Sequence, residues 1–127
     1  MKTKVLVIDD NLPAGETLKW VMEAAGHEVC LATNGVTALS KIRDFVPDVV
    51  LSDISMPKMD GYETCKRMRQ DPRLKNTLFI AQTGLDSAHS RRLSQEAGFK
   101  HHLIKPVDAN HLLELVFFEG VRSPIAS

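Results

Sequence analysis

The sequence lacks a long hydrophobic run. No apolar stretch approaches the ~20 residues that a helix needs to cross a bilayer. The residues from Met1 to Lys4 lead directly into a strand-like segment, without the apolar core and cleavage site of a secretory signal peptide. We therefore expect a soluble, cytoplasmic protein that does not associate with membranes.

Cysteine and net charge are also scarce. Cys30 and Cys65 stand apart, without the CxxC or Cys/His spacing of a zinc site or a disulfide framework, so we interpret them as small buried apolar residues. The 16 Lys and Arg residues are balanced by 16 Asp and Glu residues. Because binding to a phosphate backbone usually needs a broad electropositive surface, direct contact with nucleic acid is not expected.

What the sequence does contain is an alternation of short strand-like runs with longer helical segments. β-Branched and aliphatic residues gather in runs at 4–8, 28–32, 48–52, 77–82 and 100–104. Such an alternation favours a parallel sheet covered on both faces, because the crossovers are right-handed. The sequence thus predicts an α/β fold: a doubly wound five-stranded parallel sheet, order 2-1-3-4-5, flanked by five helices in the flavodoxin-like arrangement. We expect one domain over residues 1–120 and a tail over 121–127.

Helical spacing and capping residues place the helices between these runs. They are expected from Asn11 or Leu12 to Gly26, up to Pro47, and over 62–69, 87–97 and 108–119. The second helix should bury apolar residues as far as the proline, namely Leu39, Ile42 and Val46. The fourth has a thin apolar stripe, mainly Ala88, Leu93 and Ala97, which predicts weak docking on the sheet.

Chemically distinctive residues follow the ends of these strand-like runs. Asp9 and Asp10 end the first, Asp53 the third, and Thr83 and Lys105 the fourth and fifth. In the predicted strand order the first and third strands are neighbours, so their acids would meet at one edge of the sheet. Clustered carboxylates suit Mg²⁺, and an aspartate can itself attack phosphorus. Asp53 is the best candidate for that nucleophile.

Over essentially the whole chain, from Lys4 to Glu119, the sequence closely resembles the receiver domain of two-component response regulators. The agreement in residue type, order and spacing covers Asp9-Asp10, Asp53 within Asp53-Ile54-Ser55-Met56-Pro57-Lys58-Met59-Asp60-Gly61, Thr83-Gly84 and Lys105-Pro106. The stretch from Ala97 to Leu103 also resembles receivers carried on hybrid sensor histidine kinases. A free-standing regulator and an excised module both stay open.

The resemblance implies a phosphorelay function. Asp53 would accept a phosphoryl group from a phosphohistidine on a sensor histidine kinase or a histidine phosphotransfer domain. Asp10, Asp53 and the backbone carbonyl of Ser55 would bind Mg²⁺, and Asp9 would act through a water. Such a module catalyses only its own phosphorylation and dephosphorylation, so it is not expected to be a metabolic enzyme.

The resemblance also implies a conformational switch. Thr83 would turn inward to bond a phosphoryl oxygen, Lys105 would pair with that oxygen, and the Lys105-Pro106 peptide would be cis. Where receivers commonly have Tyr or Phe, this chain has His102. Two interpretations stay open: a ring that makes the output face pH-sensitive, or a partly exposed histidine tolerated on an edge strand. Leu85 offers no hydrogen bond to attacking water, which predicts slow dephosphorylation.

Partner surfaces can be suggested as well. Leu115 and Phe118 on the outer side of the last helix could join the fourth helix and last strand in a homodimer or effector surface. By resemblance alone, Leu12, Pro13 and Ala14 would help to dock the histidine donor. Two alternative functions stay open: a small Mg²⁺-dependent aspartyl phosphohydrolase, which would need an Asp-x-Asp pair and a cap domain, and a non-phosphorylated interaction module.

Overall fold

The computed structural model describes residues 2–84 and 87–120, and strands and helices alternate along them as predicted. The strands are β1 (Lys4–Ile8), β2 (Glu28–Ala32), β3 (Val49–Asp53), β4 (Leu78–Thr83) and β5 (His101–Ile104). The helices are α1 (Leu12–Ala24), α2 (Gly35–Lys41), α3 (Gly61–Arg69), α4 (Ala88–Ala97) and α5 (Ala109–Glu119), with a short 3-10 helix at Pro72–Leu74.

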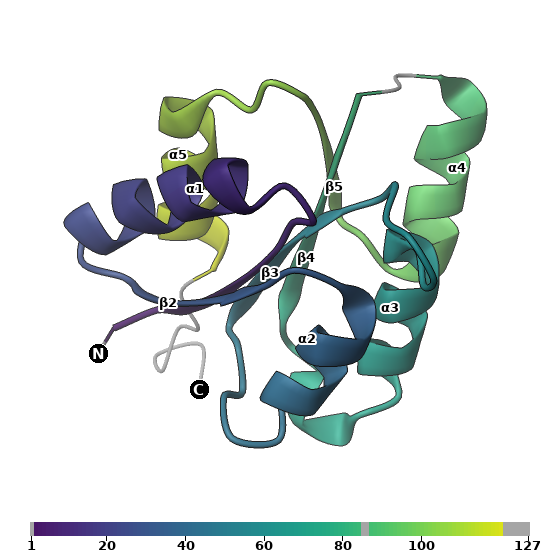
Figure 1. Ribbon diagram of the computed structural model, residues 1–127, viewed down its shortest axis with the longest axis horizontal. Helices are drawn as coiled ribbons and strands as arrows, with labels where there is room; N and C mark the ends of the chain where they lie inside the picture. The colour runs from purple at the N-terminus through teal and green to yellow at the C-terminus, as the bar shows by residue number, and fades with distance from the viewer. Residues whose placement is uncertain (1, 85–86, 121–127) are drawn as a thin grey trace.

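The strands form one parallel sheet in the order β2-β1-β3-β4-β5, which confirms the predicted fold class. Helices α1 and α5 cover one face, and α2, α3 and α4 cover the other (Figure 1). The chain leaves β1 for β2 on one side and later returns to β3 on the other side. Ligands of doubly wound sheets bind at such a switch point, outside the carboxyl ends of the strands.

Two apolar layers hold the helices to the sheet. Leu6, Ile8 and Phe79 belong to the layer under α2, α3 and α4, whereas Val7 and Ile80 belong to the layer under α1 and α5. Successive residues go to opposite layers because side chains alternate along a strand. All of these side chains are fully buried, and each such burial contributes about 1.5–3 kcal/mol. The central strands are therefore a rigid base for the residues at their ends.

Helix α2 is shorter than predicted. It ends at Lys41, and the chain continues in turns before Pro47, so Val46 is only partly buried and lies outside the helix. Ile42 is buried as expected. The guanidinium of Arg73 donates to the carbonyls of Ile42 and Arg43, at 3.1 and 3.3 Å. These bonds satisfy carbonyl groups at the end of the helix, which explains why it can stop well before the proline.

The buried face of α4 is only partly the predicted one, because Ala97 is buried as expected but Ala88 is not. Ala88 is exposed and Leu93 only partly buried, while Ser90 and Ser94 are buried beside Ala97. The helix begins with a capping box in which Ser87 and Ser90 bond to each other's backbone N–H groups. The Ser94 hydroxyl lies within hydrogen-bond distance of His102 on β5. The side of α4 that faces the sheet therefore carries two buried serines together with the apolar Ala97.

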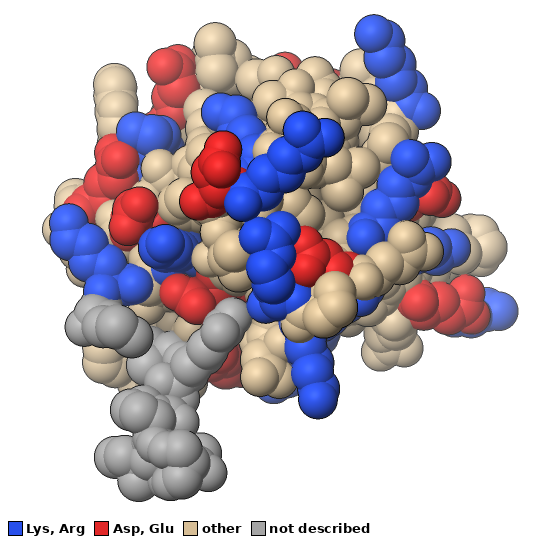
Figure 2. Space-filling model, turned by 90° about the horizontal axis from the view of Figure 1, so that it is seen from below, with Lys and Arg blue, Asp and Glu red and all other residues tan. Residues whose placement is uncertain are grey.

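The surface shows no single dominating charge in the view from below. Lys and Arg side chains are interspersed there with Asp and Glu (Figure 2). Within residues 2–84 and 87–120, none of the helices has the length and hydropathy of a membrane-spanning segment. Both cysteines are free: Cys65 is buried as expected, and Cys30 is only partly buried.

Candidate functional site

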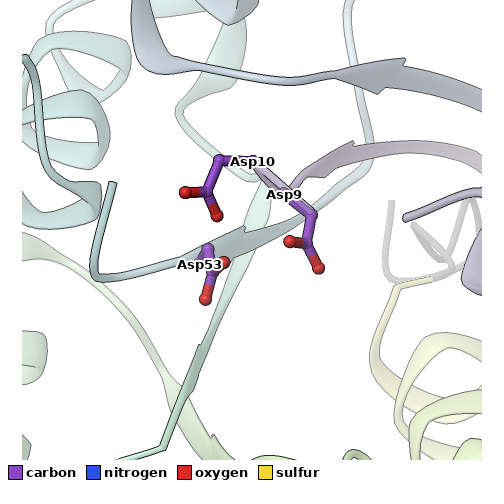
Figure 3. A group of neighbouring side chains, drawn as sticks. All are labelled: Asp9, Asp10 and Asp53. Carbon is purple, nitrogen blue, oxygen red and sulfur yellow. The ribbon is translucent and has the colours of Figure 1, made fainter. Parts of the chain in front are cut away.

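Three aspartates meet at the ends of β1 and β3. Asp9 and Asp10 follow β1, Asp53 is the last residue of β3, and these strands pair directly, with Ile8 opposite Ser52. One carboxylate oxygen from each aspartate lies within 4.8 Å of the others, and Figure 3 shows the side chains gathered at this edge. The cluster expected from the spacing of the sequence is present.

Two aspartates of the cluster, Asp10 and Asp53, line an open cleft of about 470 Å³. Lining this cleft are Asp10, Asn11, Asp53, Ser55, Thr83, Gly84 and Lys105. Asp9 is fully buried and Asp53 is 3 % exposed, whereas Asp10 is exposed. A ligand entering the cleft would therefore meet Asp10 first and Asp53 at its floor.

Lys105 supplies a positive charge to this floor. Its Nζ lies 2.8 Å from each carboxylate oxygen of Asp53 and 3.9 Å from Oδ1 of Asp9. The Lys105-Pro106 peptide bond is cis, and the Lys105 backbone N–H donates to the carbonyl of Thr83 at 2.8 Å. The end of β5 is thus tied to the end of β4 while its lysine reaches past β4 to β3.

The environment of Asp53 raises its pKa to about 7. Burial is the largest cause; the hydrogen bond from Lys105 opposes it, and the nearby charge of Asp9 adds to it. Without further positive charge, Asp53 is therefore only partly ionised near neutral pH. A cation placed between these carboxylates would favour the ionised, nucleophilic form.

The ligand set fits a hard divalent cation. The available groups are carboxylate oxygens, which Mg²⁺ and similar ions prefer. Exposure of Asp10 leaves room for the several waters that Mg²⁺ usually keeps. The residues present are therefore compatible with the magnesium site expected from the resemblance.

Gly61 allows the loop after β3 to pack against the site. A Cβ atom at this position would overlap the backbone carbonyl of Asp53. The Gly61 N–H also donates to the carbonyl of Ile54 at 2.8 Å, and Asp60 caps α3 through the N–H of Glu63. The start of α3 therefore holds the chain around Asp53 in place.

The predicted switch residues share one face of the sheet. Thr83 ends β4 and is buried, and His102 on β5 pairs with Ala81, which places both side chains on the side of α4. His102 Nδ1 lies 2.9 Å from Ser94 Oγ. Its buried Nε2 has no hydrogen-bond partner among the described residues. His101 points to the other face and contacts Glu119 at 2.8 Å.

Two polar contacts near the site were missed by the sequence analysis. Gln82 belongs to a strand-like run, yet its buried amide donates to Asp9 at 3.2 Å. Ser94 is the partner of His102. An amide inside an otherwise apolar strand was a signal for the first contact. Nothing in the sequence pointed to the second, because it depends on how α4 is turned.

The expectation for the outer side of α5 is only partly confirmed, and two further expectations fall on residues that the structure does not describe. Leu115 is partly buried against the core rather than on the outer side of α5, whereas Phe117 and Phe118 are exposed. Leu85, proposed to affect dephosphorylation, lies outside the described residues, as does the expected tail over 121–127.

Comparisons with known proteins agree with this geometry. Residues 5–117 match the model of the response regulator receiver domain. Protein PilG of Pseudomonas aeruginosa is 33% identical over 110 residues, covering 87% of this chain and 82% of that protein. Response regulator PleD of Caulobacter vibrioides is 32% identical over 97% of this chain, which spans only 26% of that longer protein.

A solved structure gives the same result. The chemotaxis response regulator CheY4 of Vibrio cholerae superposes with a TM-score of 0.86 and 30% identity, over 92% of this chain and 98% of that one. The sheet order, the acidic cleft and the match over residues 5–117 lead to one assignment. The chain belongs to the receiver-domain family of two-component response regulators, which are phosphorelay signalling modules.

Proposed function

We propose that this chain accepts a phosphoryl group on Asp53 from a phosphohistidine donor, with Mg²⁺ as its cofactor. One observation carries the proposal: Asp53 lies buried at the floor of an open cleft, with Lys105 on both of its oxygens and two further aspartates beside it. The donor would be a sensor histidine kinase or a histidine phosphotransfer domain. We assign this role to a domain spanning residues 1–120, in the cytoplasm.

The transfer is a substitution at phosphorus. A carboxylate oxygen of Asp53 forms an O–P bond while the N–P bond of the phosphohistidine breaks, and the electron pair leaves with the histidine nitrogen. Mg²⁺, held by Asp10, Asp53 and the Ser55 carbonyl, with Asp9 acting through a water, would neutralise charge on the phosphoryl oxygens. Lys105 would keep a positive charge beside these oxygens after transfer.

The signal would leave through the surface around α4, β5 and α5. Thr83 lines the phosphorylation cleft, so its hydroxyl could turn toward a phosphoryl oxygen. His102 lies on the same side of the sheet and is bonded to α4 through Ser94. A change at Thr83 could thus reach α4 and the exposed Phe118 on α5. The partner there would be a downstream effector or a second copy of the chain.

The alternative of an aspartyl phosphohydrolase is not favoured. Such an enzyme would carry a second aspartate two residues after its nucleophile, and Ser55 occupies that position. The interaction module without phosphorylation is also not favoured, because the three acids expected for a metal site lie together in one cluster. Neither alternative has an observation of its own in support.

The test is direct phosphorylation. The protein is incubated with Mg²⁺ and acetyl phosphate, and intact mass reveals addition of a phosphoryl group that hydroxylamine removes, as expected for an acyl phosphate. Asp53→Asn should abolish the addition, and Asp44→Asn, at an exposed loop position, should not. Turnover of an external phosphoester without a stable adduct would favour the hydrolase instead.

A further inference from the structure

Gln82 is a polar residue at a buried position of β4, in a layer of the core that consists mainly of apolar side chains. It lies on β4, whose residues are all buried, and is itself only 1% exposed. Ile80, two residues earlier, belongs to the apolar layer under α1 and α5. Because side chains alternate along a strand, Gln82 points to that same layer. Burying an amide there is unfavourable unless it has a hydrogen-bond partner.

The partner is Asp9. Gln82 Nε2 donates to Asp9 Oδ2 at 3.2 Å, and the backbone N–H of Asn11 donates to Asp9 Oδ1 at 2.9 Å. An ionised carboxylate only accepts hydrogen bonds, so it is the amide nitrogen of Gln82 that must face it. Both oxygens of Asp9 are thus held by N–H donors. Lys105, at 3.9 Å from Oδ1, is too distant for a hydrogen bond.

The Asp9 carboxylate is thus restrained from two directions. The Asn11 N–H belongs to the chain just after β1, whereas Gln82 reaches Asp9 from β4, on the far side of β3. A single donor would leave the carboxylate free to rotate about its Cβ–Cγ bond, and a second donor from another strand fixes it. A side chain already fixed before an ion arrives loses less conformational freedom on binding.

We infer that Gln82 is a positioning residue for the divalent cation: it orients Asp9 and thereby sets the affinity of the acidic cluster for Mg²⁺. The inference rests on the proposed function, since it needs a metal at this site. Gln82 acts through Asp9 and is not itself a ligand. Asp9 in turn would reach the ion through a water. Hydrogen-bonding partners in the surroundings of a metal site typically change metal affinity by about 10–100-fold when removed.

The test measures Mg²⁺ binding by isothermal titration calorimetry, without any phosphodonor. Gln82→Met keeps the length of the side chain but removes its N–H groups, and we expect the dissociation constant to rise by about 10-fold or more. Ile80→Met is the matched control, because Ile80 lies on the same strand and the same face and its side chain cannot donate a hydrogen bond to Asp9. Its dissociation constant should stay within twofold of the wild-type value. Equal affinity in Gln82→Met and wild type would overturn the inference.

A second measurement uses the unaltered protein. In nuclear magnetic resonance spectra, the side-chain amide protons of Gln82 should exchange slowly with solvent and shift when Mg²⁺ is added. Rapid exchange with no shift, in a protein that does bind Mg²⁺, contradicts the inference even if the Met variant does not fold. Wild-type protein that binds no Mg²⁺ would instead remove the proposed metal site itself, which separates the two failures.

Discussion

Lys105 Nζ lies 2.8 Å from both carboxylate oxygens of Asp53, although their strands are separated in the sheet by β4. The long lysine side chain spans that strand and places its charge over the floor of the cleft. The contact joins the candidate nucleophile to the end of the last strand. His102 lies on that strand, three residues before the lysine. Charge at the phosphorylation site and the position of β5 are thus physically connected.

Removing this contact should slow phosphorylation. Lys105→Met leaves the buried Asp53 without its cation, which raises the pKa of the carboxyl further and removes charge stabilisation of the phosphoryl oxygens. We expect the initial rate with acetyl phosphate at neutral pH to fall about 10–100-fold. The rate is measured by intact mass against time. Lys100→Met, at an exposed lysine paired with Glu119, is the control, and equal rates in both variants would refute the role.

The raised pKa of Asp53 predicts how stability depends on pH. The pKa of its carboxyl is about 7 in the folded protein, against an ordinary value of 3.8, so the folded state binds more protons between these two pH values. With divalent cations removed by EDTA, the free energy of unfolding should therefore decrease as pH rises through that window. Asp53→Asn should remove this decrease and stabilise the protein at pH 8 by about 1–2 kcal/mol.

Urea unfolding at pH 5 and pH 8 measures both effects. Added Mg²⁺ should restore stability to the wild type at pH 8, because it binds the ionised carboxylates of the folded state. Asp44→Asn again serves as the control at an exposed acid. A wild type whose stability rises from pH 5 to pH 8 in EDTA, with Asp53→Asn following the same curve, would contradict the prediction.

His102 should change its rotamer on phosphorylation. Its ring is bonded to Ser94 and lies on the same side of the sheet as Thr83, and its buried Nε2 lacks a partner among the described residues. A ring held by one bond can leave this position when the neighbouring threonine moves. We expect the imidazole nitrogen signals to shift when a beryllofluoride phosphoryl mimic is added. Identical ring positions with and without the mimic would refute this.

Gly61→Ala should destabilise the fold through a backbone clash. The added Cβ would overlap the carbonyl of Asp53, a backbone atom that cannot rotate away. We expect a loss of about 1–3 kcal/mol in the free energy of unfolding. Gly84→Ala is the matched control, since a Cβ there meets no atom of the described residues within 4 Å. Thermal unfolding compares the two, and equal losses would argue against a steric cause.

The sequence was informative where structure depends on local pattern. Alternation of β-branched runs and helical segments predicted the sheet and its order, because right-handed crossovers leave few arrangements. Asp10 and Asp53 follow or end neighbouring strands. They were therefore expected at one edge of the sheet, because the carboxyl ends of parallel strands lie at the same edge. Predicting the acid cluster needed no knowledge of side-chain packing, because it followed from the strand ends and the predicted strand order.

Tertiary structure decided what depends on contacts between distant segments. The early end of α2 follows from Arg73, about thirty residues farther along the chain. The buried Ser94 of α4 has its partner, His102, on β5. Burial, Lys105 and Asp9 together set the pKa of Asp53. The role of the Gln82 amide can be recognised only when β4 is placed beside β3. A hydrogen bond to Asp9 needs the right distance and the right direction, and the order of residues by itself fixes neither.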